Sequence, residues 1–350
     1  MTSRARTRIQ AVALLGAAAF ALTMPTQAPS QALTVSGYAD LFAYVDKLGS
    51  GNKEFYFDNY HVNLIMIGKI TGDLFAAVEL EYEHGGEETA LEYGYFGYTG
   101  FKDVRIMAGK FIVPFGRFNK DIHPTPINKV PDRPLGFGDV LPQTYNDVGL
   151  WISGAKAMND DARFVFDVFM VNGLLGKDGG SIRSMRDNDR EIADYGRDDD
   201  KALGGRLGFE LPYQGFDIGA SAYRGRYART KDLEDLGLVL LGLDASYQKN
   251  GFALRGEVVR ASQDASAGDL TKTGGYVQAS YWLTERVEPV IRYSTQEFPS
   301  DKDDLGRMVL GLNFQVSPAS IVRLAYLLNS EKAAFKKDNN ALVAQFNVLF

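Results

Sequence analysis

The sequence predicts an all-β fold: a transmembrane, antiparallel, up-and-down β-barrel of about 16 strands, with a long third loop that folds inward. Three observations carry this prediction. Sixteen segments of roughly ten residues place apolar side chains at alternate positions, which is typical of a strand with one face toward lipid and the other toward a lumen. The connections between these segments alternate between short and long. An N-terminal export signal indicates that the protein leaves the cytoplasm.

The export signal occupies residues 1–32. Three arginines precede the apolar run Ile9–Met24, and a short stretch rich in Ala, Gln and Pro follows it. This order is typical of a secretory signal peptide. Small residues frame a cleavage site before Leu33, with cleavage after Ala28 as the alternative. The barrel is therefore expected to comprise residues 33–350, located in the outer membrane of a Gram-negative bacterium.

Composition narrows the class further. The chain has 38 basic and 44 acidic residues, a net charge of −6, and loss of the three signal arginines makes it −9. An acidic surface of this kind does not favour nucleic acid as a partner. There is no cysteine, so stability must come from packing and a hydrogen-bonded sheet. No apolar run after the signal approaches the roughly 18 residues of a membrane helix, although the chain holds 22 Phe and 18 Tyr.

The predicted strands follow one another with a regular alternation of connections. In chain order they are Leu33–Val45, Phe57–Ile70, Leu74–Glu83, Leu91–Thr99, Val104–Val113, Val148–Ala157, Arg163–Val171, Leu203–Leu211, Phe216–Tyr223, Leu236–Tyr247, Phe252–Ala261, Gly275–Leu283, Val287–Thr295, Arg307–Val316, Ile321–Leu328 and Leu342–Phe350. Seven short turns interleave with eight longer polar connections. This interleaving matches periplasmic turns and surface loops, and an even strand count places both termini on the periplasmic side.

Individual segments differ in how clearly they show the pattern. Leu74–Glu83 is clear, because an apolar face alternates with one that becomes acidic toward the loop. Leu236–Tyr247 is almost continuously apolar, so periodicity alone leaves a buried helix open there. Leu342–Phe350 ends in phenylalanine, which resembles the terminal signal of bacterial outer-membrane barrels. We expect it to pair with the first strand and remove both sheet edges, rather than to be an ordinary amphipathic edge strand.

The fifth strand and its surroundings resemble a known family. Residues 103–119 read DVRIMAGKFIVPFGRFN, and residues 141–154 read LPQTYNDVGLWISG. These segments resemble the phosphate-selective porin O and P family in the positions Gly109, Lys110, Phe111, Val113, Pro114, Phe115, Gly116, Asp147, Gly149 and Gly154. Residues 58–83, DNYHVNLIMIGKITGDLFAAVELEYE, are similar to the second and third strands of the same group.

The resemblance implies a sixteen-stranded, usually trimeric barrel in which loop three narrows a water-filled pore. Residues 114–147, which contain six prolines, are the expected constriction loop. Its candidate residues are Arg117, Lys120, Asp121, His123, Lys129, Asp132 and Arg133. Phosphate-selective members carry a lysine cluster near the constriction. Here four loop cations are nearly balanced by Asp121, Asp132 and Asp139, so we expect weak rather than strong preference for phosphate.

Charged side chains on the polar faces of the strands are expected to point into the lumen, because a charge on the lipid face costs up to about 2 to 4 kcal/mol near the midplane. The pore-lining candidates are Arg105, Arg163, Arg206, Arg255, Arg292, Arg307, Arg323, Asp40, Glu79, Glu81 and Glu83. The last four arginines form the expected anion track, since guanidinium groups stay charged and offer forked donors. The alternative is that the arginines pair with Asp167, Glu257 and Glu288 and only stiffen the wall.

The three histidines give no sign of an enzyme. His61 lies on a strand beside Asn63, where an outer-membrane lipase would carry a nucleophilic serine. His84 and His123 lie in loops without paired ligand spacing. We therefore expect no catalytic residue, no metal site and no cofactor. A hydrolase that uses His61 remains a distant alternative, and the acidic stretch Lys177–Asp200 is interpreted as a solvated surface loop.

The principal hypothesis is an outer-membrane porin for passive diffusion of small hydrophilic solutes, leaning toward inorganic anions. A structural or partner-binding barrel with little free conduction is the alternative. The expected partners are outer-membrane lipid and lipopolysaccharide, further copies of the chain in a homotrimer, and the permeating solutes.

Overall fold

The structure is a computed structural model that describes residues 32–47, 53–122, 124–184, 201–228, 236–300, 304–332, 334, 336–337 and 339–350. Three predicted features lie wholly or mostly outside these ranges: the signal segment, His123 and the acidic loop Lys177–Asp200. Within the described ranges, no helix has the length and apolar character needed to cross a membrane.

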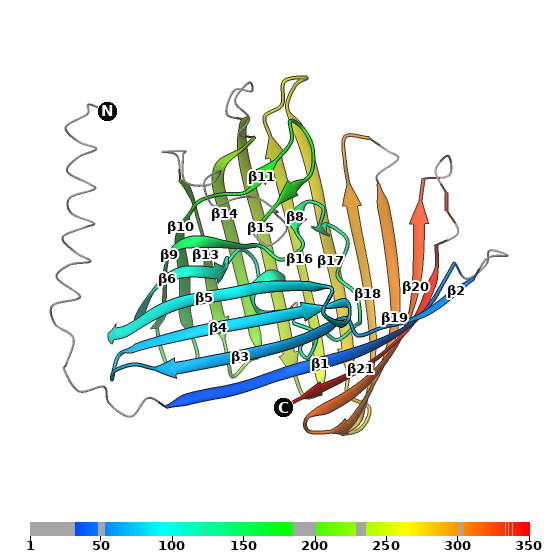
Figure 1. Ribbon diagram of the computed structural model, residues 1–350, viewed down its shortest axis with the longest axis horizontal. Coiled ribbons are helices and arrows are strands. Elements are labelled where there is room, and N and C mark those ends of the chain that lie inside the picture. Colours follow the sequence, from blue (N-terminus) through cyan, green and yellow to red (C-terminus); the bar gives the residue numbers. More distant parts are fainter. Residues whose placement is uncertain are drawn as a thin grey trace.

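Sixteen antiparallel strands form the wall of a barrel (Figure 1). They are β1 (Leu33–Asp46), β3 (His61–Lys69), β4 (Leu74–Glu83), β5 (Glu88–Phe101), β6 (Val104–Ile112), β9 (Asn146–Ala157), β10 (Arg163–Val171), β13 (Ala202–Leu211), β14 (Phe216–Ala228), β15 (Leu236–Lys249), β16 (Phe252–Gln263), β17 (Leu270–Tyr281), β18 (Val287–Glu297), β19 (Leu305–Ser317), β20 (Ser320–Glu331) and β21 (Ala341–Leu349). Each pairs with the next wall strand along the chain. The predicted fold class is confirmed.

The first and last strands close the ring. β1 and β21 pair from Tyr38 opposite Leu349 to Val45 opposite Leu342. The terminal residue extends this ladder, since the Gly37 N–H donates to the Phe350 carbonyl at 2.9 Å and the Phe350 N–H donates back at 3.0 Å. Closure leaves neither edge of the sheet unpaired, which a barrel in hydrocarbon requires. The pairing expected for the final strand is thus present.

The second predicted strand is interrupted. β2 (Glu54–Asp58) pairs with the outer end of β1, and β3 pairs with its inner part. Ala39 lies opposite Val62 and Phe42 lies opposite Asp58, so three steps on β1 match four steps on the other side. This is a β-bulge, and such an extra residue bends a strand and re-aims its side chains.

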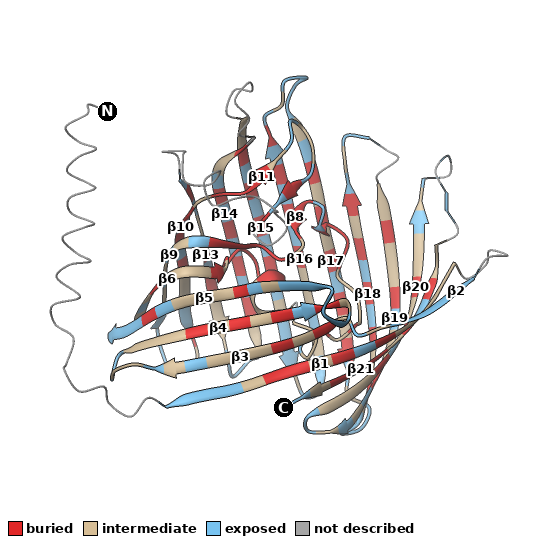
Figure 2. Ribbon diagram, in the orientation of Figure 1, coloured by how far each residue is buried: buried red, intermediate tan, exposed pale blue. Residues whose placement is uncertain are grey.

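The two faces of the wall differ as a barrel requires. On β10, Phe169 is 1% exposed and points inward, whereas Val168 is 52% exposed and points outward. Figure 2 shows the same alternation of buried and exposed positions along the other strands. On β15 both faces are apolar, because Leu240 is buried inside while Leu241 is exposed outside. The continuous apolar run that left a helix open is therefore a strand.

Short elements join the wall strands inside and above the ring. They are the 3-10 turn η1 (His84–Gly86), the π-helical turn η2 (Phe118–Ile122), and the strands β7 (Phe137–Gly138), β8 (Leu141–Pro142), β11 (Leu175–Gly176) and β12 (Ile182–Arg183). Among the described residues, β7 pairs with β8 and β11 pairs with β12, apart from the wall. Sequence periodicity cannot detect elements of two residues.

The interior contains an apolar core built between the wall and the connection that joins β6 to β9. Phe115, Phe137 and Tyr145 of that connection belong to one buried cluster with Phe169 and Tyr276 of the wall. A barrel of sixteen strands is wide enough to leave an aqueous channel unless something fills it. Here the connection fills one side of the lumen.

Candidate functional site

The connection between β6 and β9, called loop three below, comprises residues 113–145 and folds into the barrel (Figure 1). Hydrogen bonds hold its two ends together. The Val113 N–H donates to the Tyr145 carbonyl at 2.8 Å, and the Asn119 amide donates to the carbonyls of both residues at 3.0 Å. The long, inward-folding third loop is therefore present, with β9 beginning at Asn146, two residues earlier than predicted.

The first part of loop three is fastened to β16 through Glu257, a buried carboxylate that is 4% exposed. Its Oε2 accepts the N–H groups of Arg117 at 3.2 Å and Phe118 at 2.8 Å. Gly116 has φ +65°, and a Cβ there would collide with the Glu257 carboxylate. Glycine is required at this position both by the left-handed backbone and by the close approach.

The middle of loop three is held by charge. Asp132 bridges two wall arginines, Arg292 at 2.5 Å and Arg307 at 3.0 Å. Arg292 also donates to the Asp132 carbonyl at 2.9 Å. Nearby, Lys129 forms an ion pair with Glu288 of β18 and donates to the Ser280 hydroxyl at 2.9 Å. Charge-assisted bonds of this kind are among the stronger polar contacts in proteins.

Further contacts attach loop three to the last two strands. Arg323 of β20 donates to the Pro126 carbonyl at 3.0 Å, and Asn347 of β21 donates to the Thr125 hydroxyl at 3.2 Å. Loop three therefore lies against strands from the second half of the chain. The inward faces of β1, β3 and β4 look onto it from the other side, because β4 and β16 are eight places apart in the ring of sixteen.

A cavity of about 280 Å³ separates loop three from that opposite wall. Its wall side includes Phe42, Tyr44 and His61, and its loop side includes Asp132 and Arg133. This cavity lies on the side of the long loops, since His61 is at the start of β3 where the connection from β2 enters the wall.

The wall facing loop three is acidic, as predicted for the first strands. Asp40, Glu79, Glu81 and Glu83 all lie on the inward faces of β1 and β4 and are 2 to 7% exposed. The Asn63 amide donates to Glu79 at 2.8 Å and to Glu81 at 3.0 Å.

A second cavity of about 230 Å³ lies toward the short turns and is rich in cations. Its basic lining residues are Arg105, Arg117, Lys120, Arg163 and Arg206, and its acidic ones are Asp121, Asp167 and Glu210. Lys120 lies 3.5 Å from Asp167 and 5.3 Å from the centre of the Trp151 ring. The two charged zones are thus displaced from each other along the barrel axis.

All seven predicted arginines lie on inward faces, and most have partners. Arg206 pairs with Asp217 at 2.9 Å and Asp244 at 2.5 Å, and Arg163 pairs with Glu210. Arg255 lies beside the amide of Gln278. The partners that the sequence offered as the wall-stiffening alternative are engaged elsewhere: Glu257 accepts loop N–H groups, Glu288 pairs with Lys129 and Asp167 pairs with Lys120.

Five of the loop candidates line one of the two cavities, namely Arg117, Lys120 and Asp121 in the cation-rich one and Asp132 and Arg133 in the other. Arg117 bonds Asp121 at 2.9 Å and Asp217 at 3.0 Å beside the cation-rich cavity, whereas Arg133 donates to the Gln143 carbonyl and to Thr144 (3.2 Å) beside the other. Sequence reasoning missed the anchoring carboxylates Asp217 and Asp244, and it did not place Glu83 beside His61. The conduction role of the candidates remains a prediction.

Comparisons with known proteins agree with this architecture. The family described as "Phosphate-selective porin O and P" matches residues 38–231. A protein of Aquifex aeolicus, itself uncharacterized, is 27% identical over 175 residues, which are 47% of this chain and 37% of that relative. The chain therefore spans well under two thirds of that relative's length.

Solved porin structures share the fold. The anion-selective porin from Comamonas acidovorans has a TM-score of 0.63 at 14% identity, covering 92% of this chain and all of the other. Salmonella typhi OmpF in complex with daunomycin gives 0.62 at 14% identity and covers 91% and 97%. The outer membrane channel DcaP of Acinetobacter baumannii gives 0.62 at 9% identity and covers 93% and 100%. At such identities the likeness concerns the fold alone.

A family match over more than half of the chain, on a sixteen-stranded porin barrel with an inward third loop, settles the class. The chain belongs to the phosphate-selective porin O and P family, a family of outer-membrane porins that are channels rather than enzymes.

Proposed function

We propose that this barrel passes small hydrophilic solutes by passive diffusion through a lumen that loop three narrows. The observation that carries the proposal is the position of loop three, which is fastened to one side of the ring and leaves cavities of about 280 and 230 Å³ beside it. A polar, water-filled path of this kind conducts without a moving part.

Single-channel recording in a planar bilayer tests the proposal. Purified protein is expected to give ohmic conductance steps with a single dominant size. Complete absence of such steps from correctly folded protein would refute it and favour the structural or partner-binding barrel.

We further propose a preference for anions that is set by the cation-rich cavity. Five basic and three acidic side chains line it, so its local field favours an anion. The family description and the anion-selective porin of Comamonas acidovorans support the same direction. The acidic wall across from loop three opposes it, which agrees with a weak preference rather than strict selection of phosphate.

Reversal potentials in a potassium chloride gradient measure this preference. Removing one positive charge about 8 Å from the permeating ions raises the energy of chloride by about 0.5 kcal/mol in water and lowers that of potassium by the same amount. Arg105→Gln is therefore expected to lower the chloride-to-potassium permeability ratio by up to about fivefold, and by less in concentrated salt. Arg260, which is exposed on the outward face of β16, supplies the matched control Arg260→Gln, which should leave the ratio unchanged. Cation preference in the unaltered protein would contradict the proposal.

We further propose that the protein forms a homotrimer, that it contacts outer-membrane lipid and lipopolysaccharide, and that its leader is cleaved. Outward apolar side chains such as Leu203, Leu207 and Leu241 are exposed and suit acyl chains. Arg224 and Arg260, outward-facing near the long-loop ends of their strands, suit the phosphates of lipopolysaccharide. Native mass spectrometry should give three chains per particle, with lipopolysaccharide bound, and a mature chain beginning at Leu33.

A further inference from the structure

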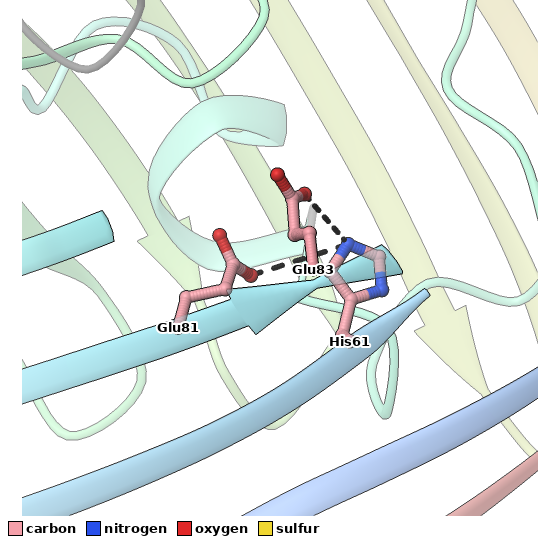
Figure 3. Close-up of side chains that lie close together, drawn as sticks. All are labelled: His61, Glu81 and Glu83. Atoms are coloured by element: carbon pink, nitrogen blue, oxygen red, sulfur yellow. Dashed lines mark ion pairs between the residues drawn. The ribbon is translucent and has the colours of Figure 1, made fainter. Parts of the chain in front are cut away.

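A histidine and two carboxylates gather on the inward face where β3 begins and β4 ends (Figure 3). His61 Nε2 lies 3.4 Å from Glu83 Oε1 and 4.0 Å from Glu81 Oε1. The three ligand atoms all fall within 4.8 Å of one another, and each residue is 5% exposed. The group lies outside the anchors of loop three described above.

The backbone builds this cluster from three features. His61 is directly opposite Glu83 in the β3–β4 register, and Asn63 is opposite Glu81, so both carboxylates share the inward face with the imidazole. His61 follows the bulge that separates β2 from β3. The bulge brings its backbone N–H to Asp40 Oδ1 at 2.8 Å.

Asp40 orients the imidazole. Its Oδ2 lies 3.0 Å from His61 Nδ1 and also accepts from the Gln345 amide at 3.1 Å. With Nδ1 bonded to Asp40, the Nε2 atom faces the oxygens of Glu81 and Glu83. Two carboxylates gathered around this nitrogen call for a proton or a metal cation between them. A carboxylate on the second nitrogen of a ligating histidine is the usual outer support of a metal site.

From this geometry we propose that His61, Glu81 and Glu83 bind a transition-metal dication of the Zn²⁺ class, with Asp40 as the supporting carboxylate. Zinc bonds of about 2.0 to 2.2 Å in a tetrahedron separate neighbouring ligand atoms by about 3.4 Å, so the His61–Glu83 distance already fits. The distance from His61 Nε2 to Glu81 Oε1 must close by about half an ångström, and the two carboxylates, whose ligand atoms lie within 4.8 Å of each other, must also approach. Calcium and magnesium prefer sites made only of oxygen ligands, so the imidazole nitrogen of His61 disfavours both ions.

Three protein ligands leave a fourth position open. His61 borders the 280 Å³ cavity between the wall and loop three, so a water or a passing solute can complete the coordination there. A bound dication adds two positive charges to the acidic wall. The next expectation rests on the proposed function: metal binding should increase the preference of the channel for anions.

Binding is tested first without any conduction assay. The purified full-length barrel, stripped with a chelator, is dialysed against Zn²⁺ and titrated with Co²⁺. We expect one ion per chain and the visible absorption of a tetrahedral Co²⁺ site. His61→Ala and Glu83→Gln should each abolish that absorption, and Asp40→Asn should weaken binding by about 10- to 100-fold.

His84→Ala is the matched control, because His84 pairs with Asp58 at 2.7 Å in the adjoining turn. It should keep both stoichiometry and spectrum. Unchanged metal binding in His61→Ala would overturn the proposal, and so would loss of binding in His84→Ala. Retention of barrel fold in each variant is checked by heat-dependent mobility on gels, and Glu83→Gln serves where His61→Ala does not fold.

The conduction arm separates the two proposals. Zn²⁺ should increase the chloride-to-potassium permeability ratio of the unaltered channel and have no effect on Glu83→Gln. Metal binding by a barrel that does not conduct would refute the proposed function but not the metal site. Conduction by a barrel that binds no metal would refute the metal site but not the proposed function.

Discussion

The Asp132 carboxylate is the charged anchor in the middle of loop three, and Asp132→Asn tests that anchor while the other contacts of the loop remain. The substitution removes the carboxylate charge that joins Arg292 at 2.5 Å and Arg307 at 3.0 Å. It keeps the volume of the side chain and the Asp132 carbonyl, which still accepts from Arg292. The change therefore isolates the ionic part of the anchor.

The expected size follows from burial. Arg292 has a side chain that is 0% exposed, and Asp132 is 11% exposed, so the charge left behind is poorly solvated. Removing one partner of a buried ion pair costs about 3 to 5 kcal/mol, and water in the lumen favours the lower figure. About 3 kcal/mol corresponds to about a 150-fold increase in the population of loop three that is released at Asp132.

Single-channel recordings would show this as a larger-conductance substate that is rare in the unaltered protein. Asp139→Asn is the matched control, since Asp139 is an exposed carboxylate of the same loop. Arg307→Gln should have a smaller effect than Asp132→Asn, because Arg307 is 24% exposed and its pair is better screened. Equal substate occupancy in Asp132→Asn and Asp139→Asn would refute the idea that this ion pair holds the loop.

Three other changes have definite expected outcomes. Gly136→Val should displace loop three from the wall and raise conductance, because even a Cβ at Gly136 would lie 2.5 Å from the Gly274 Cα. An unchanged conductance would contradict this close contact. Deletion of residues 120–138 should raise conductance and admit larger solutes in liposome swelling, whereas a structural barrel would lose a bound partner instead. The Phe298 N–H and Lys332 lower the pKa of Asp304 below its ordinary 3.8. The stabilising contact of the Asp304 carboxylate is therefore fully present above pH 3.8 and is lost as the pH falls through the lowered pKa of Asp304 in the folded protein. The Phe298 amide signal in an acid titration should report this loss.

The strands could be predicted because their information is local. Alternation along the chain predicts Leu74–Glu83 and Arg163–Val171 residue for residue as β4 and β10. The break between β2 and β3 could not be predicted, because it involves a contact between distant residues. The Asn59 side-chain amide donates to the Asp40 carbonyl at 2.7 Å, across 19 positions of the chain. The two-residue strands lack any period to detect.

The partners of the lumen charges depend on contacts between distant parts of the chain, unlike the strands. The inward direction of the arginines follows from strand alternation, so sequence alone predicts it. Their partners do not, because Arg206 reaches past its cross-strand neighbour Asp167 to Asp217 and Asp244. Asp132 reaches the wall only after loop three folds back, and no pattern in the sequence encodes that return. The sequence places His61 on a strand beside Asn63 but does not identify Glu83 as its partner, since Glu83 becomes its neighbour only through the β3–β4 register.

The attachment of loop three to the last strands constrains the order of barrel assembly. Its contacts join residues 160, 175, 197 and 222 positions apart along the chain. Contacts at such separations form late, since the intervening chain must first be ordered. The partner of Thr125 lies on β21, the strand that also seals the ring against β1. Insertion of the loop and sealing of the ring are therefore coupled steps, and a nascent barrel that lacks its final strands would hold loop three by its first anchors only.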